Sequence, residues 1–268
     1  MLPANYHVHS SFSPDSTTPP EAQLQAAEQL GLPEICFTDH IERYDVAYED
    51  FVPNVRSYVT HIRRLHSDSV RIKLGAEAGM KDYQSDQSKL CGLLGGESYD
   101  FVIASLHFVN NYSPFMPEFF TGHTPKTIFP MYVSALYQAV QGFDVSYWDC
   151  VGHIDFMTKG VHGWRDPRMC YRDAADELDT LFRFLIENGK CIEYNTASYA
   201  AIPHLSLPGA DWLRRWKELG GEYITIGTDA HTPDRMGLRL QEALDMIKTT
   251  GIRYYATFEK HEPVLHRI

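Results

Sequence analysis

Two histidines separated by one residue, His7 and His9, stand near the start of the chain in the sequence His-Val-His. Side chains at positions i and i+2 of a β-strand point to the same face, so both imidazoles can reach one site. Asp229 and His231 repeat this spacing near the other end of the chain. Neutral imidazoles together with carboxylates suit zinc, iron, manganese or cobalt. The residue types and their spacing therefore predict a metal site.

Other residues of metal-ligating type come at the ends of short apolar runs that are typical of β-strands. They are His40, Glu77, His107 and His153. In a parallel barrel the carboxyl ends of all strands meet at one mouth, so residues far apart in the sequence converge there. A lone His-x-His is usually a coincidence, and a single buried histidine is more often a hydrogen-bonded core residue. The joint pattern at successive strand ends instead favours one shared site.

The elements expected to carry these residues alternate between short strands and longer helices. The expected strands cover 6–8, 34–37, 70–76, 101–105, 150–153, 191–194 and 223–226, with 253–258 as an eighth or edge strand. Start and stop signals predict helices over 20–30, 52–65, 171–187, 209–219 and 236–249. Repeated β–α units without a linker predict one closed α/β barrel over residues 1–268.

Composition limits the classes of function. The 268 residues carry a formal net charge of −11, which argues against sequence-independent nucleic-acid binding because that needs clustered Lys and Arg. No apolar run reaches the ~18 residues that span a membrane, and the first residues do not have the pattern of a signal peptide. The five cysteines form no CxxC pair. We therefore expect a cytoplasmic protein with no nucleic-acid or membrane partner, either a monomer or a homodimer.

In their ordered combination these residues resemble the signatures of the PHP (polymerase and histidinol phosphatase) superfamily of metal-dependent phosphoesterases. The matching segments are His7-Val-His9 with Asp15, Thr38-Asp39-His40, Glu77, Ser105-Leu106-His107, Gly152-His153-Ile154-Asp155 and Asp229-Ala230-His231. Chain length, Phe143-Asp144-Val145 and Glu193-Tyr194-Asn195-Thr196 are most similar to the stand-alone histidinol-phosphatase branch.

The resemblance implies a single distorted (β/α)7 barrel with three divalent metal ions of zinc, manganese or iron. His7, His9, Glu77 and Asp229 would hold the first metal. Glu77 would bridge to a second metal, completed by His107 and His153, and Asp15, His40 and His231 would hold the third. Taken alone, Asp15 would be a turn residue, and only the resemblance makes it a ligand.

The implied activity is hydrolysis of a small phosphate ester, L-histidinol phosphate, to L-histidinol and phosphate in histidine biosynthesis. A hydroxide between two metals about 3.5–4 Å apart would attack phosphorus in line, and Asp155 or His231 would protonate the leaving alkoxide. The residues expected to contact the substrate are Lys159, Arg165, Asn195 and Tyr112. Tyr112 belongs to an aromatic loop over 108–125 that could form a lid, whereas Lys159 and Arg165 also fit solvated loop charges.

Three alternatives remain open. A PHP-type phosphoesterase could act on another small phosphomonoester, a nucleotide or a cyclic phosphodiester. An amidohydrolase-type enzyme on a related barrel typically uses a lysine as the metal bridge, where this chain has Glu77. A non-catalytic binding module is disfavoured because inactive relatives tend to lose ligands first.

Overall fold

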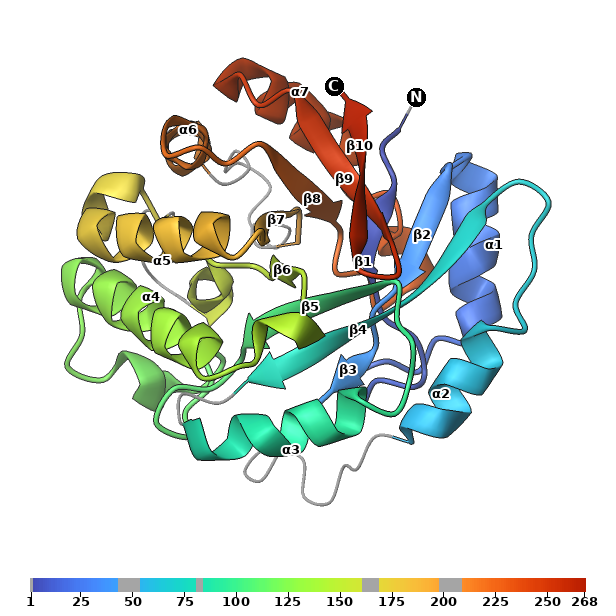
Figure 1. Ribbon diagram of the computed structural model, residues 1–268, viewed down its shortest axis with the longest axis horizontal. Coiled ribbons are helices and arrows are strands. Elements are labelled where there is room, and N and C mark those ends of the chain that lie inside the picture. Colours follow the sequence, from blue (N-terminus) through green and yellow to red (C-terminus); the bar gives the residue numbers. More distant parts are fainter. Residues whose placement is uncertain (1, 43–53, 81–83, 161–168, 198–208) are drawn as a thin grey trace.

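Parallel strands form the wall of a barrel in the computed structural model, which describes residues 2–42, 54–80, 84–160, 169–197 and 209–268 (Figure 1). In order around the wall they are β1 (Asn5–Val8), β2 (Glu34–Phe37), β4 (Arg71–Met80), β5 (Phe101–Leu106), β6 (Cys150–Val151), β7 (Cys191–Asn195) and β8 (Tyr223–Gly227). Each strand pairs in parallel with the next. The barrel closes where the amide of His9 donates to the carbonyl of Ala230 at 2.9 Å. The predicted (β/α)7 barrel is confirmed.

Helices cover the outside of this wall (Figure 1). They are α1 (Pro20–Leu30), α2 (Val55–Ile62), α3 (Gln84–Leu94), α4 (Pro125–Gln141), α5 (Ala175–Glu187), α6 (Ala210–Glu218) and α7 (Leu240–Thr250). The signals predicted for α1 are present, since Pro20 opens the helix and Gly31 ends it with a φ of 66°, a conformation that suits glycine. The expected helices did not include α3 and α4, and α4 contains Pro130, a residue that normally ends a helix.

Three strands differ from the simple barrel pattern. β3 (His40–Ile41) pairs with the second half of β4. β9 (Tyr254–Glu259), the predicted last strand, pairs in parallel with the start of β8, whereas β1 contacts the chain just after β8. β10 (Glu262–Arg267), which was not expected, runs antiparallel to β9. β4 also extends to Met80, so Glu77 lies inside this strand rather than at its end.

The core consists of buried apolar residues from both the strands and the helices. All six residues of β5 are buried, as expected for a parallel strand covered on both faces. At the amino-terminal end, the buried Glu34 accepts hydrogen bonds from the hydroxyl of Tyr6 and from Nε of Arg71. These contacts tie β1, β2 and β4 together at the end of the barrel opposite to the carboxyl ends of the strands.

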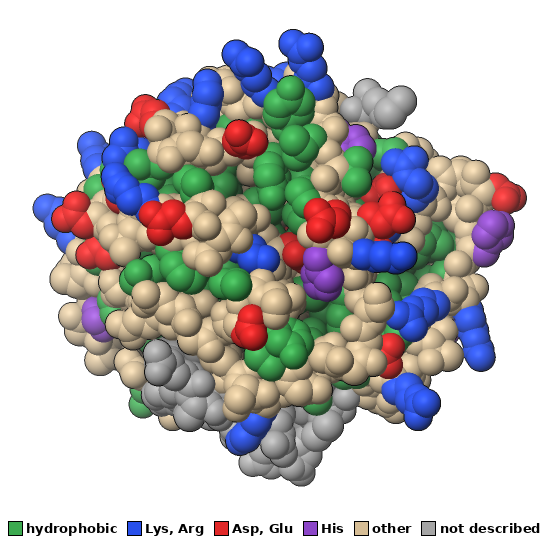
Figure 2. Space-filling view, viewed as in Figure 1, with side chains coloured by type: hydrophobic (Ala, Val, Ile, Leu, Met, Phe, Trp, Pro, Cys, Tyr) green, Lys and Arg blue, Asp and Glu red, His purple; other side chains and the backbone are tan. Residues whose placement is uncertain are grey.

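The described surface carries both signs of charge. On the face shown in Figure 2, acidic and basic side chains are interspersed with exposed hydrophobic ones. Among the helices that the structure describes, none combines the length and apolarity needed to cross a membrane.

Candidate metal centre

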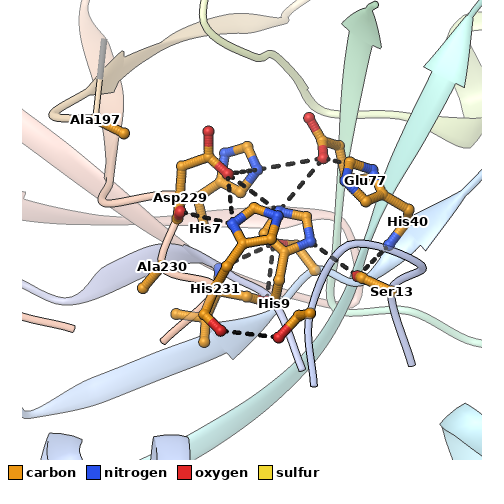
Figure 3. Close-up of polar contacts among 12 residues, drawn as sticks. His7, His9, Ser13, His40, Glu77, Ala197, Asp229, Ala230 and His231 are labelled. Atoms are coloured by element: carbon orange, nitrogen blue, oxygen red, sulfur yellow. Dashed lines mark hydrogen bonds and ion pairs between the residues drawn. The ribbon is translucent and has the colours of Figure 1, made fainter. Parts of the chain in front are cut away.

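Histidines and carboxylates gather at the mouth of the barrel. Figure 3 shows His7, His9, Asp229 and His231 on one side, while Glu77 and His40 point toward the same space from the other side. The structure brings together the nine residues that the sequence predicted as metal ligands, which are His7, His9, Asp15, His40, Glu77, His107, His153, Asp229 and His231. We call these nine residues the His/carboxylate cluster.

Glu77 lies in the middle of the cluster, and its two oxygens face different histidines. Oε2 lies 3.4 Å from Nε2 of His7 and 3.4 Å from Nε2 of His9. Oε1 lies 3.2 Å from Nε2 of His107 and 2.8 Å from Nε2 of His153. In each of these two sets the donor atoms lie within 4.8 Å of one another. This arrangement allows one carboxylate to bridge two neighbouring cations.

Asp15 and two further histidines form a third group. Oδ2 of Asp15 lies 3.4 Å from Nε2 of His40 and 3.1 Å from Nε2 of His231. The rings of His9 and His231 stack with their centroids 4.1 Å apart. The third group is therefore in direct contact with the first. It is also more open to solvent, because the Asp15 side chain is 35% exposed whereas that of Glu77 is 1% exposed.

The backbone at Asp229 explains how residues beyond the end of β8 reach the cluster. Asp229 has a φ of 53°, in the left-handed region, and strain of this kind in a non-glycine residue costs about 1–3 kcal/mol. The resulting turn places Oδ1 of Asp229 3.3 Å from Nε2 of His9. The carbonyl of Asp229 accepts a hydrogen bond from Nδ1 of His231 at 3.0 Å. Asp229 and His231 thus face the same site although both lie beyond the end of β8.

The donor atoms of the cluster fit a metal. Nε2 of His7, His9 and His231 and Oε2 of Glu77 are buried and have no hydrogen-bond partner among the described residues. A buried polar atom without a partner costs about 1–3 kcal/mol. Several such atoms facing one space would be satisfied by a bound cation. Imidazole and carboxylate donors without a thiolate suit zinc, manganese or iron.

Burial and neighbouring charges shift the pKa values within the cluster. Burial, together with His231 and His40, lowers the pKa of His9 to about 3, so this imidazole is neutral and ready to bind a metal. Burial alone would raise the pKa of Glu77, but the surrounding histidines hold it well below its usual value. Burial would lower the pKa of His107, yet Glu42 and Glu77 raise it to about 9. Protons and metals therefore compete for some members of the cluster.

Buried residues behind the cluster hold its histidines in place. Oε1 of Glu193 lies 2.6 Å from Nδ1 of His7. Nδ1 of His9 lies 3.0 Å from the hydroxyl of Ser13, which donates to the carboxylate of Asp39 at 2.8 Å. Nδ1 of His107 contacts both oxygens of Glu42 at 3.1 Å. Partners of this kind fix the tautomer and the orientation of a metal-binding imidazole.

The sequence reasoning did not assign these supporting roles. Asp39 and Glu193 lie inside motifs that it quoted, but neither received a function. Glu42 was not mentioned, although its position two residues after His40 repeats the i and i+2 spacing that identified the other pairs. Only the tertiary structure reveals which histidine each carboxylate supports.

A pocket of about 140 Å³ opens over the cluster. Besides cluster residues, its lining contains Phe108, Ser113, Phe115, Phe156 and Lys159. The ring of Phe156 lies 5.0 Å from that of His107 and 4.7 Å from that of His153. Phe115 meets Phe156 edge to face at 5.6 Å. The pocket thus joins a polar floor to an apolar wall.

The other predicted site residues lie at different distances from this pocket. Nζ of Lys159 lines it and lies 2.5 Å from Oδ2 of Asp229. Asp155 is buried and contributes to the raised pKa of Lys159, although Asp229 contributes more and burial acts in the opposite direction.

Asn195 is buried and donates to Oε2 of Glu193 at 3.1 Å. Tyr112 is 45% exposed and is absent from the described pocket lining, where Ser113 and Phe115 stand instead. Arg165 lies outside the described residues.

The family assignment follows from a match over most of the chain. A family model of the PHP domain matches residues 5–197, more than half of the chain. The chain belongs to the PHP domain family. Its barrel and its cluster place it among the metal-dependent hydrolases of this family.

Individual relatives narrow the comparison. The chain is 32% identical to the histidinol-phosphatase of Lactococcus lactis over 262 residues, which cover 96% of this chain and 95% of that protein. The crystal structure of histidinol phosphate phosphatase from Lactococcus lactis, complexed with zinc, L-histidinol and phosphate, superimposes with a TM-score of 0.87 at 30% identity, covering 97% and 98% of the two chains. A structure from Listeria monocytogenes shares the fold with a TM-score of 0.71 at 14% identity, covering 87% and 97%.

Proposed function

We propose that this chain is a metal-dependent phosphomonoesterase that hydrolyses L-histidinol phosphate to L-histidinol and phosphate in histidine biosynthesis. The observation that carries the proposal is a pocket in which one lysine and an aromatic wall stand over a cluster of histidines and carboxylates. The similarity to a relative whose structure contains zinc, L-histidinol and phosphate supports the same substrate.

The cluster is proposed to hold three divalent ions. His7, His9, Glu77 and Asp229 would hold the first ion, Glu77, His107 and His153 the second, and Asp15, His40 and His231 the third. When bound, such ions polarise a phosphoryl group and supply a water-derived nucleophile at neutral pH. Zinc is the metal named for the similar structure, and the donor set also suits manganese and iron.

Lys159 is proposed to bind the phosphate. Its ammonium lies at the edge of the pocket, 2.5 Å from Asp229 and 5.1 Å from the ring centroid of Phe156. Burial lowers its pKa, but Asp229 together with Glu77 and Asp155 raises the pKa above its usual value, so the group is charged at neutral pH. A charged lysine next to the cluster can hold an anionic oxygen and neutralise its charge.

The apolar wall is proposed to receive the imidazole part of the substrate. Phe115 and Phe156 meet edge to face at the pocket, and aromatic rings of this kind can pack against a planar imidazole. Phe115 is 61% exposed and belongs to the segment over 108–125, so we propose that this segment acts as a lid over the substrate in a single barrel domain.

Two residues can supply the proton that the leaving alkoxide needs. His231 lines the pocket, and although burial lowers its pKa, Asp15 and Asp229 raise it. A protonated imidazole can donate to an oxygen at the mouth, but His231 would have this proton only when its Nε2 does not hold the third metal, because its Nδ1 donates to the carbonyl of Asp229. Asp155 is buried near Lys159 and is the second candidate. Asn195 is proposed to act through Glu193 rather than through direct contact with the substrate.

Phosphate release from a panel of esters tests the function. Protein loaded with zinc or manganese receives histidinol phosphate, an aryl phosphate, a nucleotide and a diester, and kcat/KM is measured for each. We expect the highest kcat/KM for histidinol phosphate. A kcat/KM for histidinol phosphate no higher than for the aryl phosphate would overturn the substrate assignment. The number of metal ions bound per chain tests the cluster separately.

A matched pair of histidine variants tests the first metal position. His9→Ala removes a buried metal donor and is expected to lower the metal content. It should also lower kcat/KM by more than ~100-fold, the upper value typical of losing a residue that only supports a ligand. His66→Ala alters a side chain that is 81% exposed and is expected to change neither. Full turnover and full metal content in His9→Ala would contradict the assignment.

Cysteine chemistry supports the compartment that we propose. All five cysteines are free, and Cys36, Cys150 and Cys191 are buried. Free buried thiols persist in a reducing environment, and we place the protein in the cytoplasm.

A further inference from the structure

Glu42 lies behind two histidines that belong to different parts of the cluster. It directly follows β3, and it is 4% exposed. Each of its carboxylate oxygens lies 3.1 Å from Nδ1 of His107. Oε1 also lies 2.9 Å from Nδ1 of His40. One buried carboxylate therefore contacts two imidazoles whose rings meet at 84°.

These contacts determine which nitrogen His107 presents to the cluster. When Nδ1 donates to Glu42, Nε2 keeps its lone pair and lies 3.2 Å from Oε1 of Glu77 and 3.4 Å from Nε2 of His153. The lone pair then points to the proposed second metal. A carboxylate at the opposite nitrogen also makes an imidazole a stronger ligand.

His40 also lies against Glu42, at the proposed third metal. Its Nδ1 lies 2.9 Å from Oε1 of Glu42 and 2.9 Å from Oε2 of Glu77, and its Nε2 lies 3.4 Å from Oδ2 of Asp15. Two carboxylates thus face the Nδ1 side, and the Nε2 side faces Asp15. The ring is held so that Nε2 can bind a cation together with Asp15 and His231.

Gly79 makes room for the carboxylate of Glu42. A Cβ atom at Gly79 in β4 would overlap Cδ and Oε2 of Glu42. Glycine is required there by space, since β4 has ordinary strand pairing with β5 at this residue. The position of Glu42 therefore depends both on β3, which it follows, and on the glycine in β4. The space at Gly79 is an observation independent of the histidine contacts, and it supports a specific position for this carboxylate.

We propose that Glu42 is a shared positioning residue that orients His107 and His40 and thereby couples the second and third metal positions. The inference rests on the metal assignment made in the proposed function. Because both imidazoles contact this carboxylate, a displacement of Glu42 removes a support from both rings. His7 and His9 are supported by Glu193 and Ser13 instead, so the first position does not depend on Glu42.

Zinc titration of metal-free protein, with a competing chelator and a metal count at saturation, tests the coupling. In Glu42→Gln and Glu42→Ala we expect two of the three zinc equivalents to weaken together by about 10–100-fold, while the third equivalent keeps its affinity. At saturating zinc the variants still reach the wild-type count. Gly79→Ala displaces the carboxylate without removing it, and we expect a smaller loss at the same two equivalents.

Glu34→Gln is the matched control, because Glu34 is also a buried glutamate but lies at the opposite end of the barrel and bonds Tyr6 and Arg71. It should leave all zinc affinities unchanged. The proposal is overturned if Glu42→Gln leaves the affinities unchanged, weakens only one equivalent, or lowers the saturated count by one, which would make Glu42 a direct ligand. The titration uses no substrate, so a wild-type chain that binds zinc but does not hydrolyse histidinol phosphate would overturn the proposed function alone.

Discussion

Oε1 of Glu193 lies 2.6 Å from Nδ1 of His7, although the two residues are 186 positions apart in the sequence. The other oxygen of Glu193 accepts a hydrogen bond from the amide of His153 at 2.8 Å. A Cβ atom at Gly227 would overlap both Glu193 and His7, so glycine permits this close approach. One carboxylate in the middle of β7 thus supports a residue of β1 and a residue just beyond β6.

Glu193→Gln is expected to weaken metal binding without changing any residue of the cluster. The neutral amide holds the imidazole of His7 less firmly, and loss of such an outer partner typically costs about 10–100-fold in affinity. Zinc competition against a chelator measures the change. Glu187→Gln, on the exposed surface of α5, is the control. Equal affinities in the two variants would show that Glu193 does not position His7.

Lys159→Met is expected to reduce kcat/KM for histidinol phosphate by about 10–100-fold, the equivalent of a charged hydrogen bond of about 1.5–3 kcal/mol. Inhibition by inorganic phosphate should weaken in parallel, because both anions use the same ammonium. Lys159→Arg keeps the charge and should recover part of the loss. Lys248→Met, in an exposed pair with Asp245, serves as the control, and an unchanged kcat/KM in Lys159→Met would exclude Lys159 from phosphate binding.

Two substrates with different leaving groups can show whether Asp155 or His231 acts as a proton donor or has only a structural role. A proton donor contributes about 10²–10⁴-fold when the leaving group is a poor alkoxide, but little when it is a stabilised nitrophenolate. We expect Asp155→Asn or His231→Gln, whichever removes the acid, to slow histidinol phosphate hydrolysis far more than p-nitrophenyl phosphate hydrolysis. Metal content must be measured in both variants, since His231 belongs to the cluster. Equal losses on the two substrates would argue against an acid role for the residue replaced.

His261, in the turn between β9 and β10, makes a pH-dependent contact with Asp149. Its Nδ1 lies 2.9 Å from Oδ2 of the buried Asp149. This hydrogen bond raises the pKa of His261, while burial and Lys190 oppose the rise and Asp100 adds to it. The stabilisation is therefore fully present below the unfolded value of about 6.5 and is lost as the pH rises through the higher folded pKa.

The free energy of unfolding of His261→Gln should accordingly fall below that of the wild type at pH 6, and the gap should narrow by pH 9. The side chain of His261 is 37% exposed, so solvent screening keeps the gap below about 1 kcal/mol. Urea unfolding of both proteins at the two pH values measures it. His66→Gln, beside the fully exposed Asp68, should show no gap. A gap that widens toward pH 9 would contradict the assigned sign.

The sequence by itself determined the barrel and the donor set. Alternating apolar runs and helix signals predicted seven parallel strands, and α1 begins and ends at the predicted residues. The same reasoning could not predict α4 with its internal Pro130, because tertiary packing outweighs local propensity there. It also placed Glu77 at a strand end, whereas β4 continues to Met80.

Only the tertiary structure decided how the donors are oriented. Spacing along a strand shows which side chains share a face, but it does not show which nitrogen of an imidazole faces the site. That choice depends on Glu193 behind His7 and on Glu42 behind His107, whose partners come from other strands. Tertiary packing likewise placed Ser113 and Phe115 rather than Tyr112 at the pocket. Local sequence patterns specify residues that can bind a metal, whereas contacts between distant segments specify their orientation.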